Sequence, residues 1–230
     1  MELKGFQKLT LLDYPGKVAC TVFTGGCNFL CPFCQNSSLV LHKGEVESIA
    51  EEDVLSYLNK RRGILDGICI TGGEPLLQDG LSEFISACKR VGMLVKLDTN
   101  GYLPDKLAVL VETGNIDYIA MDIKSSPKGY ALAAGLQNLD IERILRSIEF
   151  IKGCGVDHEF RTTVVSELHS AEDIEAIGKL ISGEKRYFLQ KFVDSGELIT
   201  AGLHAASDEK MNEYLSLVQR YVPTAELRGM

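Results

Sequence analysis

The sequence has 230 residues, of which 45% are hydrophobic, so it can bury a sizeable core as a single domain over residues 1–230. Its net charge is -8 and no run of Lys and Arg forms a basic stripe, which argues against a nucleic-acid partner. No apolar stretch approaches the roughly 20 residues that span a bilayer. The start, M-E-L-K, lacks the apolar core of a signal peptide. We therefore expect a cytoplasmic protein with no membrane partner.

Short apolar runs alternate with amphipathic helical segments along the chain. The runs are bounded by Gly, Asn, Pro or charge, as expected of parallel strands that helices cover. Six strands are predicted, at residues 18–23, 67–71, 94–98, 118–122, 159–165 and 187–192. Repeated β-α units form either a barrel-like or a doubly wound sheet. We favour an α/β fold with an incomplete (β/α)6 barrel of parallel strands, because chemical motifs follow several successive strands.

The helices between these strands have predictable boundaries. Gly92 and Gly114 are placed to end two of them, and residues 141–151 carry the clearest apolar stripe. Helix starts are predicted at a capping box of Ser48 and Glu51, at Pro104, at Ser170 with Asp173, and at Ser207.

Three cysteines form a C-x3-C-x2-C motif, Cys27, Cys31 and Cys34, directly after the first predicted strand. Thiolates this close can converge on one soft metal centre, and iron–sulfur clusters are held by Cys thiolates. Three ligands would leave one iron of a [4Fe-4S] cubane open to an outside molecule. We therefore predict a cluster-binding loop over residues 24–46.

The alternative for this motif is a structural zinc site. Zinc takes four ligands, usually as two ligand pairs. The nearest further candidate is His42, and the sequence has no second C-x2-C. The cysteines outside the motif lie in apolar surroundings and are expected to be buried small hydrophobes: Cys20, Cys69, Cys88 and Cys154.

Polar motifs follow the next three predicted strands. G-G-E-P occupies residues 72–75, where paired glycines allow close approach to a ligand and Glu74 could meet an ammonium group. D-T-N-G occupies residues 98–101, and its short polar side chains could bind ribose hydroxyls, an amino group or a cation. Each motif could instead be ordinary turn chemistry. D-I-K occupies residues 122–124. Its Lys either pairs with a ligand carboxylate or extends its ammonium group to water.

Two further candidates lie within the fifth and sixth predicted strands. Arg161 stands amid apolar residues and needs an anionic partner, either a ligand or an acidic residue of a neighbouring strand. Gln190 is the corresponding polar residue of the sixth strand. Together, the motifs predict one rim that presents an open iron beside groups able to bind an amine, hydroxyls and a carboxylate. A zwitterionic nucleoside sulfonium suits that combination.

At these residues the chain resembles the radical S-adenosylmethionine enzymes, from Gly5 to the sixth predicted strand. Within that superfamily it is similar to the glycyl radical enzyme activases. The opening G-F-Q-K-L at residues 5–9 and D-Y-P-G-K at residues 13–17 resemble the anaerobic ribonucleoside-triphosphate reductase activating proteins.

The resemblance implies roles for individual positions. Cys27, Cys31 and Cys34 match the cluster ligands, and Phe33 matches an aromatic residue beside the adenine. Gly72, Gly73 and Glu74 match the segment that holds the methionyl amino group. Asp98 and Asp122 match carboxylates near the methionine end of the cofactor, where some activases bind a monovalent cation. Lys124 matches the residue near the methionyl carboxylate. Asn100, Arg161 and Gln190 complete the predicted cofactor-binding set.

Two positions depart from the activase pattern. Gln35 stands where many activases have His after the third Cys. Gln190 or Lys191 stands where the pyruvate formate-lyase activase contributes a His to the cofactor. The resemblance thus leaves the contact from the sixth strand open.

By resemblance, a flavodoxin- or ferredoxin-type reductant supplies an electron that cleaves S-adenosylmethionine. The resulting 5′-deoxyadenosyl radical takes a hydrogen atom from a glycine of a glycyl radical enzyme, here anaerobic ribonucleotide reductase. No catalytic residue beyond the cluster and cofactor is required. Two alternatives stay open. One is a radical enzyme that acts on a small molecule, as a deazapurine synthase does. The other is an iron–sulfur electron carrier, against which the missing fourth Cys weighs.

Overall fold

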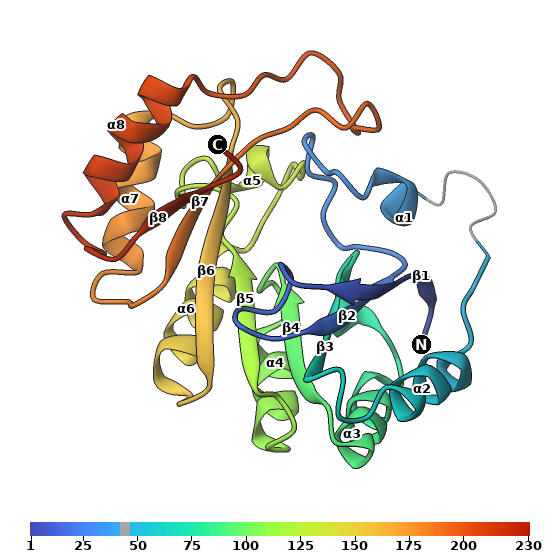
Figure 1. Ribbon diagram of the computed structural model, residues 1–230. Helices are drawn as coiled ribbons and strands as arrows, with labels where there is room; N and C mark the ends of the chain where they lie inside the picture. Colours follow the sequence, from blue (N-terminus) through green and yellow to red (C-terminus); the bar gives the residue numbers. More distant parts are fainter. Residues whose placement is uncertain (42–46) are drawn as a thin grey trace. The chain divides into compact units, whose positions relative to one another are not determined.

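A computed structural model describes residues 1–41 and 47–230 (Figure 1). Its strands form one sheet in the order β1-β2-β3-β4-β5-β6-β7-β8. β1 runs antiparallel to β2, whereas β2–β3, β3–β4, β6–β7 and β7–β8 pair in parallel. The sheet is open, and with its helices it confirms the predicted α/β class. No helix in the described part of the chain is long and apolar enough to cross a membrane.

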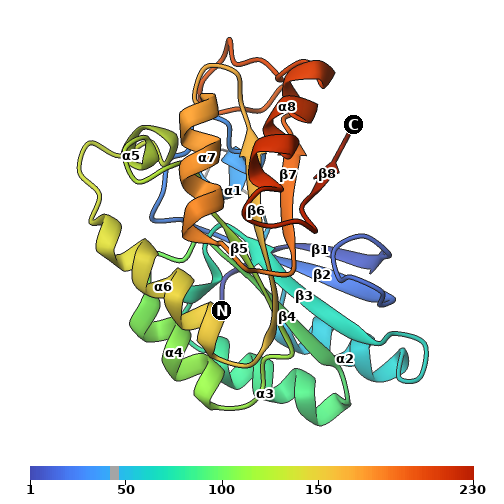
Figure 2. The same cartoon turned by 90° about the vertical axis from the view of Figure 1, so that its left-hand side faces the viewer.

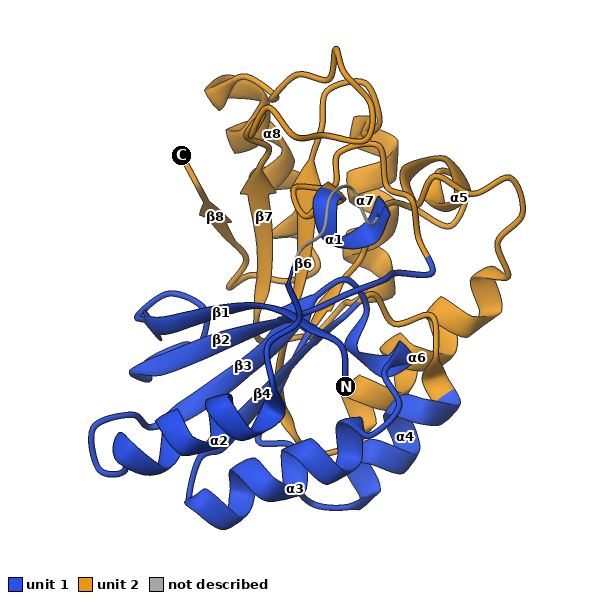
Figure 3. Cartoon of the chain, turned by 90° about the vertical axis from the view of Figure 1, so that its right-hand side faces the viewer, with its two compact units in different colours: residues 1–28, 38–99, 105–120 blue, residues 29–37, 100–104, 121–230 orange. Residues whose placement is uncertain are grey.

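The chain divides into two compact units, shown in different colours in Figure 3. Unit 1 comprises residues 1–28, 38–99 and 105–120, and unit 2 comprises residues 29–37, 100–104 and 121–230. Strand β5 (Tyr118–Asp122) and helices α1 (Ser37–Leu41) and α4 (Pro104–Glu112) cross the boundary. A single domain over residues 1–230 stays a prediction.

Unit 1 contains four whole strands with helices packed against them (Figure 3). Its elements are β1 (Leu3–Thr10), β2 (Ala19–Thr24), α2 (Glu51–Lys60), β3 (Gly67–Gly72), the 3-10 helix η1 (Pro75–Leu77), α3 (Leu81–Val91) and β4 (Leu94–Thr99). The parallel register aligns Thr21 with Cys69 and Cys69 with Lys96. These three side chains therefore share one face of the sheet, since successive side chains of a strand alternate between faces.

Unit 2 continues from β5 with helices and parallel strands. Its elements are α5 (Tyr130–Ala133), α6 (Ile141–Gly153), β6 (Asp157–Val164), α7 (Ala171–Leu180), β7 (Tyr187–Lys191), α8 (Asp208–Val218) and β8 (Glu226–Arg228). Helices α7 and α8 lie side by side (Figure 2). On α6 the predicted stripe is confirmed, because Ile144, Ile148 and Ile151 are buried.

All six predicted strands are present, as β2 to β7, with ends that differ by no more than two residues. The sequence did not indicate β1 or β8. β1 mixes Lys, Gly and Gln with its apolar residues and is stabilised by antiparallel pairing with β2. β8 has only three residues, which is too short to show a period.

The capping box predicted at Ser48 and Glu51 is wrong. Helix α2 begins at Glu51 after Ala50, which makes no side-chain cap. Ile49 N donates to Leu3 O at 2.8 Å, so pairing with β1 holds residue 49 in an extended bridge and delays the helix. The Ser48 hydroxyl instead accepts a hydrogen bond from Lys4 Nζ at 3.0 Å.

The other predicted boundaries are confirmed. Ser170 and Asp173 form a capping box at the start of α7, and the Ser207 hydroxyl caps α8. Pro104 is the first residue of α4. Helix α3 ends at Gly92, whose φ of 93° is a left-handed conformation that favours glycine.

Replacing Ser170 by Ala removes the hydroxyl oxygen that accepts a hydrogen bond from Asp173 N at 3.2 Å. We expect the free energy of unfolding to fall by about 1 kcal/mol, the usual loss for a capping side chain. Urea unfolding followed by circular dichroism measures the change. The control is Ser216→Ala, because the Ser216 hydroxyl bonds only Asn212 O of its own helix. An unchanged S170A midpoint would contradict the capping role.

Candidate active site

The three cysteines of the motif fall in both units. Cys27 belongs to unit 1, whereas Cys31 and Cys34 belong to unit 2. None of the three forms a disulfide. Within unit 2, Cys34 N donates to Cys31 O at 3.0 Å, so a tight turn brings these two residues close together. All three are therefore free thiols, as metal ligands must be.

Burial raises the pKa of the Cys31 thiol to about 11 and also raises the pKa of Cys34. Two such thiols stay protonated at neutral pH until a cation takes the place of their protons. A coordinating metal deprotonates a thiol outright. Cys31, which is buried, and Cys34, which is half-buried, can therefore serve as thiolate ligands of an iron–sulfur cluster.

The part of the cysteine loop in unit 2 is fixed by α5 and the turn after it. Leu30 N donates to Ala134 O at 2.9 Å. A Cβ atom on Gly135, whose φ is +68°, would lie 2.0 Å from Leu30 O, so the contact requires glycine. The buried ring of Phe29 packs against Tyr102 and Tyr130, with centroid distances of 5.4 and 6.4 Å. The loop is thus fixed by backbone contact on one side and by aromatic packing on the other.

The segment after β7, residues 192–200, supports the same loop through backbone atoms. Gln35 Nε2 donates to Val193 O at 3.0 Å, and Thr200 N donates to Pro32 O at 3.0 Å. The Ser37 hydroxyl donates to Glu197 O. No pattern in the sequence indicated these contacts. They account for Gln35, where many activases have His, because the amide reaches a carbonyl more than 150 residues along the chain.

In unit 1 the G-G-E-P turn lies directly against the start of the cysteine loop. Gly73 N donates to Thr24 O, and Glu74 N donates to Gly26 O, both at 2.9 Å. A Cβ atom on Gly73 would lie only 1.8 Å from Gly26 O. Gly72 has a φ of +112°, and its Cβ atom would lie 2.4 Å from Thr24 N. Both glycines are therefore required by packing, and their contact with a cofactor stays a prediction.

Glu74 is a buried carboxylate, 1% exposed. Its Oε1 accepts hydrogen bonds from Leu76 N at 3.1 Å and from Thr99 Oγ1 at 2.8 Å. The first of these bonds caps η1. Glu74 is thus held in one orientation by the turn that follows β3 and by the end of β4.

Asp98, also in unit 1, has a partner that the sequence did not indicate. Lys96 stands two residues earlier on the same face of β4, and its ammonium group donates to Asp98 Oδ1. The Lys96 side chain is 1% exposed and also lies 3.7 Å from Cys69 Sγ. A Lys inside the apolar run of β4 was the available signal, because lysine is almost never fully buried without a partner.

Asn100 is buried at the start of the following turn, in unit 2. Its Oδ1 accepts a hydrogen bond from Tyr102 N at 3.0 Å, which is ordinary Asx-turn geometry. Gly101, with a φ of +74°, accepts a hydrogen bond from the Ser147 hydroxyl at 2.6 Å through its carbonyl. The turn alternative therefore accounts for the geometry of Asn100, and a role in cofactor binding stays a prediction.

Asp122, Lys124 and Arg161 form a charged cluster in unit 2. Arg161 Nε donates to Asp122 Oδ1 at 2.8 Å, and Lys124 Nζ donates to Asp122 Oδ2 at 3.2 Å. Burial alone would raise the pKa of Asp122, but Arg161 and Lys124 outweigh it and hold this pKa well below its usual range. Burial would likewise lower the pKa of Lys124, but the Asp122 carboxylate raises it above its ordinary value. Arg161 therefore has an acidic partner on the neighbouring strand.

His169 joins this cluster to the cysteine loop, and the sequence did not single it out. Its Nδ1 accepts a hydrogen bond from Val165 N at 3.0 Å, and its Nε2 lies 2.8 Å from Lys124 O. A neutral ring with the proton on Nε2 satisfies both contacts. The ring meets the buried Phe33 edge to face, with centroids 6.4 Å apart. His169 thereby positions both Phe33 and the backbone of Lys124.

The remaining residues singled out in the sequence are Gln190, His42 and the cysteines outside the motif. Gln190 is half-buried on β7, where it pairs with Thr163 and Arg228 of the adjacent strands, and its contact with a cofactor stays a prediction. His42 and the last residues of the predicted 24–46 loop lie outside the described residues. Cys20, Cys69 and Cys88 are fully buried, as expected, and Cys154 is half-buried at the end of α6.

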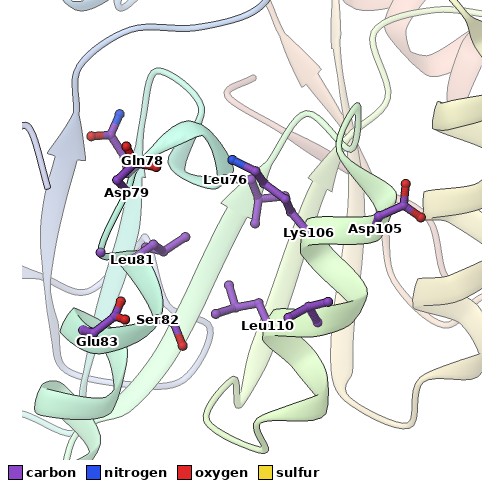
Figure 4. A pocket seen from close by; sticks show the side chains of 11 residues that line it. Leu76, Gln78, Asp79, Leu81, Ser82, Glu83, Asp105, Lys106 and Leu110 are labelled. Atoms are coloured by element: carbon purple, nitrogen blue, oxygen red, sulfur yellow. The ribbon is translucent and has the colours of Figure 1, made fainter.

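A separate cavity of about 410 Å³ lies in unit 1. Leu76, Leu81 and Leu110 supply apolar lining from η1, α3 and α4, and Asp105 and Lys106 lie at the start of α4 (Figure 4). Its lining shares no residue with the predicted cofactor-binding set.

Comparison with known proteins identifies the family of the chain. Residues 21–181, well over half of its length, match the family model of the radical SAM superfamily. The chain therefore belongs to this superfamily. Membership implies a [4Fe-4S] cluster and S-adenosylmethionine as cofactors.

Two curated relatives differ in how much of each chain they share with this one. A Methanocaldococcus jannaschii protein, provisionally named a glycyl-radical enzyme activating enzyme, is 30% identical over 98% of this chain and 95% of its own length. The GTP 3',8-cyclase of Helicobacter pylori is 28% identical over 67% of this chain and 49% of its own length. The chain thus spans nearly all of the first relative and about half of the second.

A solved structure supports the fold. The crystal structure of Streptococcus suis SuiB bound to S-adenosylmethionine matches 89% of this chain and 48% of its own, with a TM-score of 0.69 and 16% identity. At this identity the likeness shows the fold alone. It agrees with the incomplete barrel predicted from the sequence.

Replacing Gly73 by Ala forces a methyl group against Gly26 O. We expect a loss of about 1–3 kcal/mol in the free energy of unfolding, since the obstacle is backbone and cannot turn away. Binding of S-adenosylmethionine to the reconstituted protein should weaken as well. Chemical denaturation and calorimetry measure the two effects. Gly153→Ala is the matched control, because nothing lies within 4 Å of its Cβ position, and it should be neutral or slightly stabilising. A Gly73→Ala protein of wild-type stability would contradict the close contact.

The stability supplied by His169 should depend on pH. Burial lowers the pKa of His169 below its ordinary value of 6.5, although the nearby carbonyl oxygens of Lys124 and Val165, which favour a protonated ring, oppose this. As pH falls below about 6.5, the unfolded chain therefore takes up the proton first and the folded state loses stability. His169→Gln cannot titrate, so the stability advantage of the wild type should shrink between about pH 7.5 and pH 5.5. Thermal melts of both proteins across this range test the sign, and a constant difference would contradict it.

Proposed function

We propose that this radical SAM enzyme is a glycyl radical enzyme activase, and that its partner is an anaerobic ribonucleotide reductase. The observation that carries the proposal is the similarity to the M. jannaschii protein with an activating-enzyme name, which extends through 98% of this chain and 95% of that one. A flavodoxin- or ferredoxin-type protein is the proposed reductant. Of the two N-terminal motifs that resemble activases, G-F-Q-K-L lies within β1 and D-Y-P-G-K lies in the segment after it.

The segment with the D-Y-P-G-K motif packs within unit 1. The Tyr14 ring is buried against Tyr118, with centroids 5.9 Å apart. The Thr21 hydroxyl donates to Asp13 Oδ2. Tyr14 therefore has a structural role in the core, and Asp13 is directed to the sheet face that Thr21 shares with Cys69 and Lys96.

Cys27, Cys31 and Cys34 are proposed to hold the cluster as thiolates. When bound, the cluster supplies the electron that cleaves S-adenosylmethionine to a radical able to take a hydrogen atom from a glycine. The chain's own task is to bind, orient and exclude water. Burial of Cys31 and Phe33 serves the last of these tasks, and the contacts of residues 193–200 hold the loop in place.

The remaining predicted residues are proposed to orient S-adenosylmethionine. In unit 1, Glu74 is fixed by Leu76 N and the Thr99 hydroxyl, so its carboxylate is ready to accept from an ammonium group. In unit 2, Lys124 remains charged beside Asp122 and can meet a carboxylate. Phe33 offers a flat apolar ring that His169 keeps in one orientation.

A second candidate is a radical SAM enzyme that acts on a small molecule. The H. pylori GTP 3',8-cyclase favours this class, although this chain spans only 49% of its length. A deazapurine synthase-like activity belongs to the same class and stays a prediction. A simple electron carrier is not supported, because the chain belongs to a superfamily of enzymes.

Mixing the reduced, cluster-loaded protein with S-adenosylmethionine and an anaerobic ribonucleotide reductase should produce a glycyl radical. We expect about four irons per chain, as one cubane requires, and a paramagnetic doublet only when both proteins are present. Electron paramagnetic resonance measures the radical, and chromatography measures 5′-deoxyadenosine. Cys31→Ala should lose both signals, whereas Cys154→Ala should keep them. Cofactor cleavage without any radical on the partner, together with consumption of GTP, would favour the small-molecule candidate.

A further inference from the structure

The two carboxylates predicted at a monovalent cation site, Asp98 and Asp122, are each paired with positive side chains of this chain. We propose that the ammonium group of Lys96 supplies the positive charge at Asp98, so that the enzyme binds and cleaves S-adenosylmethionine without an added monovalent cation. This inference rests on the proposed placement of Asp98 near the methionine end of the cofactor. It does not depend on which partner receives the radical.

Lys96 is built into unit 1 as a tethered cation. Its side chain is 1% exposed, and its ammonium donates to Asp98 Oδ1. Cys69 Sγ lies 3.7 Å from both Lys96 Nζ and Asp98 Oδ1, so three groups on neighbouring strands form one contact. The parallel register of β3 and β4 places Cys69 beside Lys96. The charge is therefore held in place by the sheet itself.

In unit 2, Asp122 independently indicates that positive side chains of the chain take the place of a monovalent cation. Arg161 Nε lies 2.8 Å from its Oδ1, and Lys124 Nζ lies 3.2 Å from its Oδ2. Both carboxylate oxygens already contact a cation. Glu159 lies 3.9 Å from Arg161 and forms a two-point pair with Arg228 at 3.0 and 3.1 Å. Arg161 and Lys124 thus supply positive charge to both oxygens of Asp122.

A monovalent metal ion does not suit these surroundings. Such an ion is attracted by carboxylates whose charge is not yet neutralised, and a neighbouring ammonium or guanidinium repels it. Replacing an exchangeable ion by a lysine tethered to β4 provides the same charge with no dependence on ion concentration. The residues that match the cation-binding pattern of some activases therefore do not form a cation site here.

Potassium dependence distinguishes this role from that of a structural ion pair. Cluster-loaded wild-type protein is assayed anaerobically in choline chloride and in potassium chloride of equal ionic strength, without any partner enzyme. The Kd for S-adenosylmethionine and the rate of 5′-deoxyadenosine formation should agree within about twofold between the two salts, because the tethered charge replaces the ion. A loss of tenfold or more in choline would overturn the proposal.

Lys96→Met keeps the length of the side chain and removes its charge. In choline it should bind S-adenosylmethionine at least about tenfold more weakly, since the Asp98 carboxylate, which is 13% exposed, has lost its partner. Potassium should restore most of this loss, because the ion can now enter beside Asp98. A folded Lys96→Met protein that binds as the wild type does, or that potassium fails to rescue, would overturn the proposal.

Lys89→Met is the matched control, because Lys89 also pairs with a carboxylate of unit 1, Asp117, at 2.6 Å. It should show wild-type affinity in both salts. Lys96→Arg should remain independent of potassium and carries the test if Lys96→Met does not fold. The double variant Lys96→Met/Asp98→Asn should bind equally well in the two salts, since no charge remains at residue 98 for potassium to neutralise. A potassium response in Lys96→Arg or in the double variant would count against the proposal.

Discussion

The direct backbone contact between the turn after β3 and the start of the cysteine loop is the constraint on which unit 1 depends. Gly73 approaches Gly26 O so closely that no side chain could stand between them. Two short hydrogen-bonded links, from Gly73 N and Glu74 N, then fix the turn to the end of β2 and to the loop. Because Glu74 also caps η1 and bonds Thr99, the same contact determines where its carboxylate lies relative to β4.

Charge balance is the second constraint, and it operates in each unit separately. Lys96 neutralises Asp98 in unit 1, and Arg161 with Lys124 neutralises Asp122 in unit 2. A buried ion pair adds little stability compared with apolar residues of the same volume, but removing one partner is costly. These ion pairs are therefore not a source of general stability, although loss of Lys96, which is buried, is expected to be costly.

The fold could be predicted because it follows from short-range patterns. Short apolar runs indicated the six strands β2 to β7, and polar residues at strand ends indicated a candidate site, whose role in cofactor binding stays a prediction. What could not be predicted depends on contacts distant in sequence. The bridge between Ile49 and Leu3 shortened α2, and His169 acquired its role only when β5, β6 and the cysteine loop came together. Lys96 was visible in the sequence, and its pairing with Asp98 follows from the alternation of side chains along β4, whereas its contact with Cys69 follows from strand register.

The support of the cysteine loop by residues 193–200 has a consequence for sequence divergence. Each of the three contacts uses a backbone atom of this segment, namely Val193 O, Glu197 O and Thr200 N. Substitutions in the segment leave these atoms in place as long as the chain keeps its course. The side chains here are consequently free to drift between related proteins, so the exposed residues of this segment can change while the cysteine loop keeps its shape.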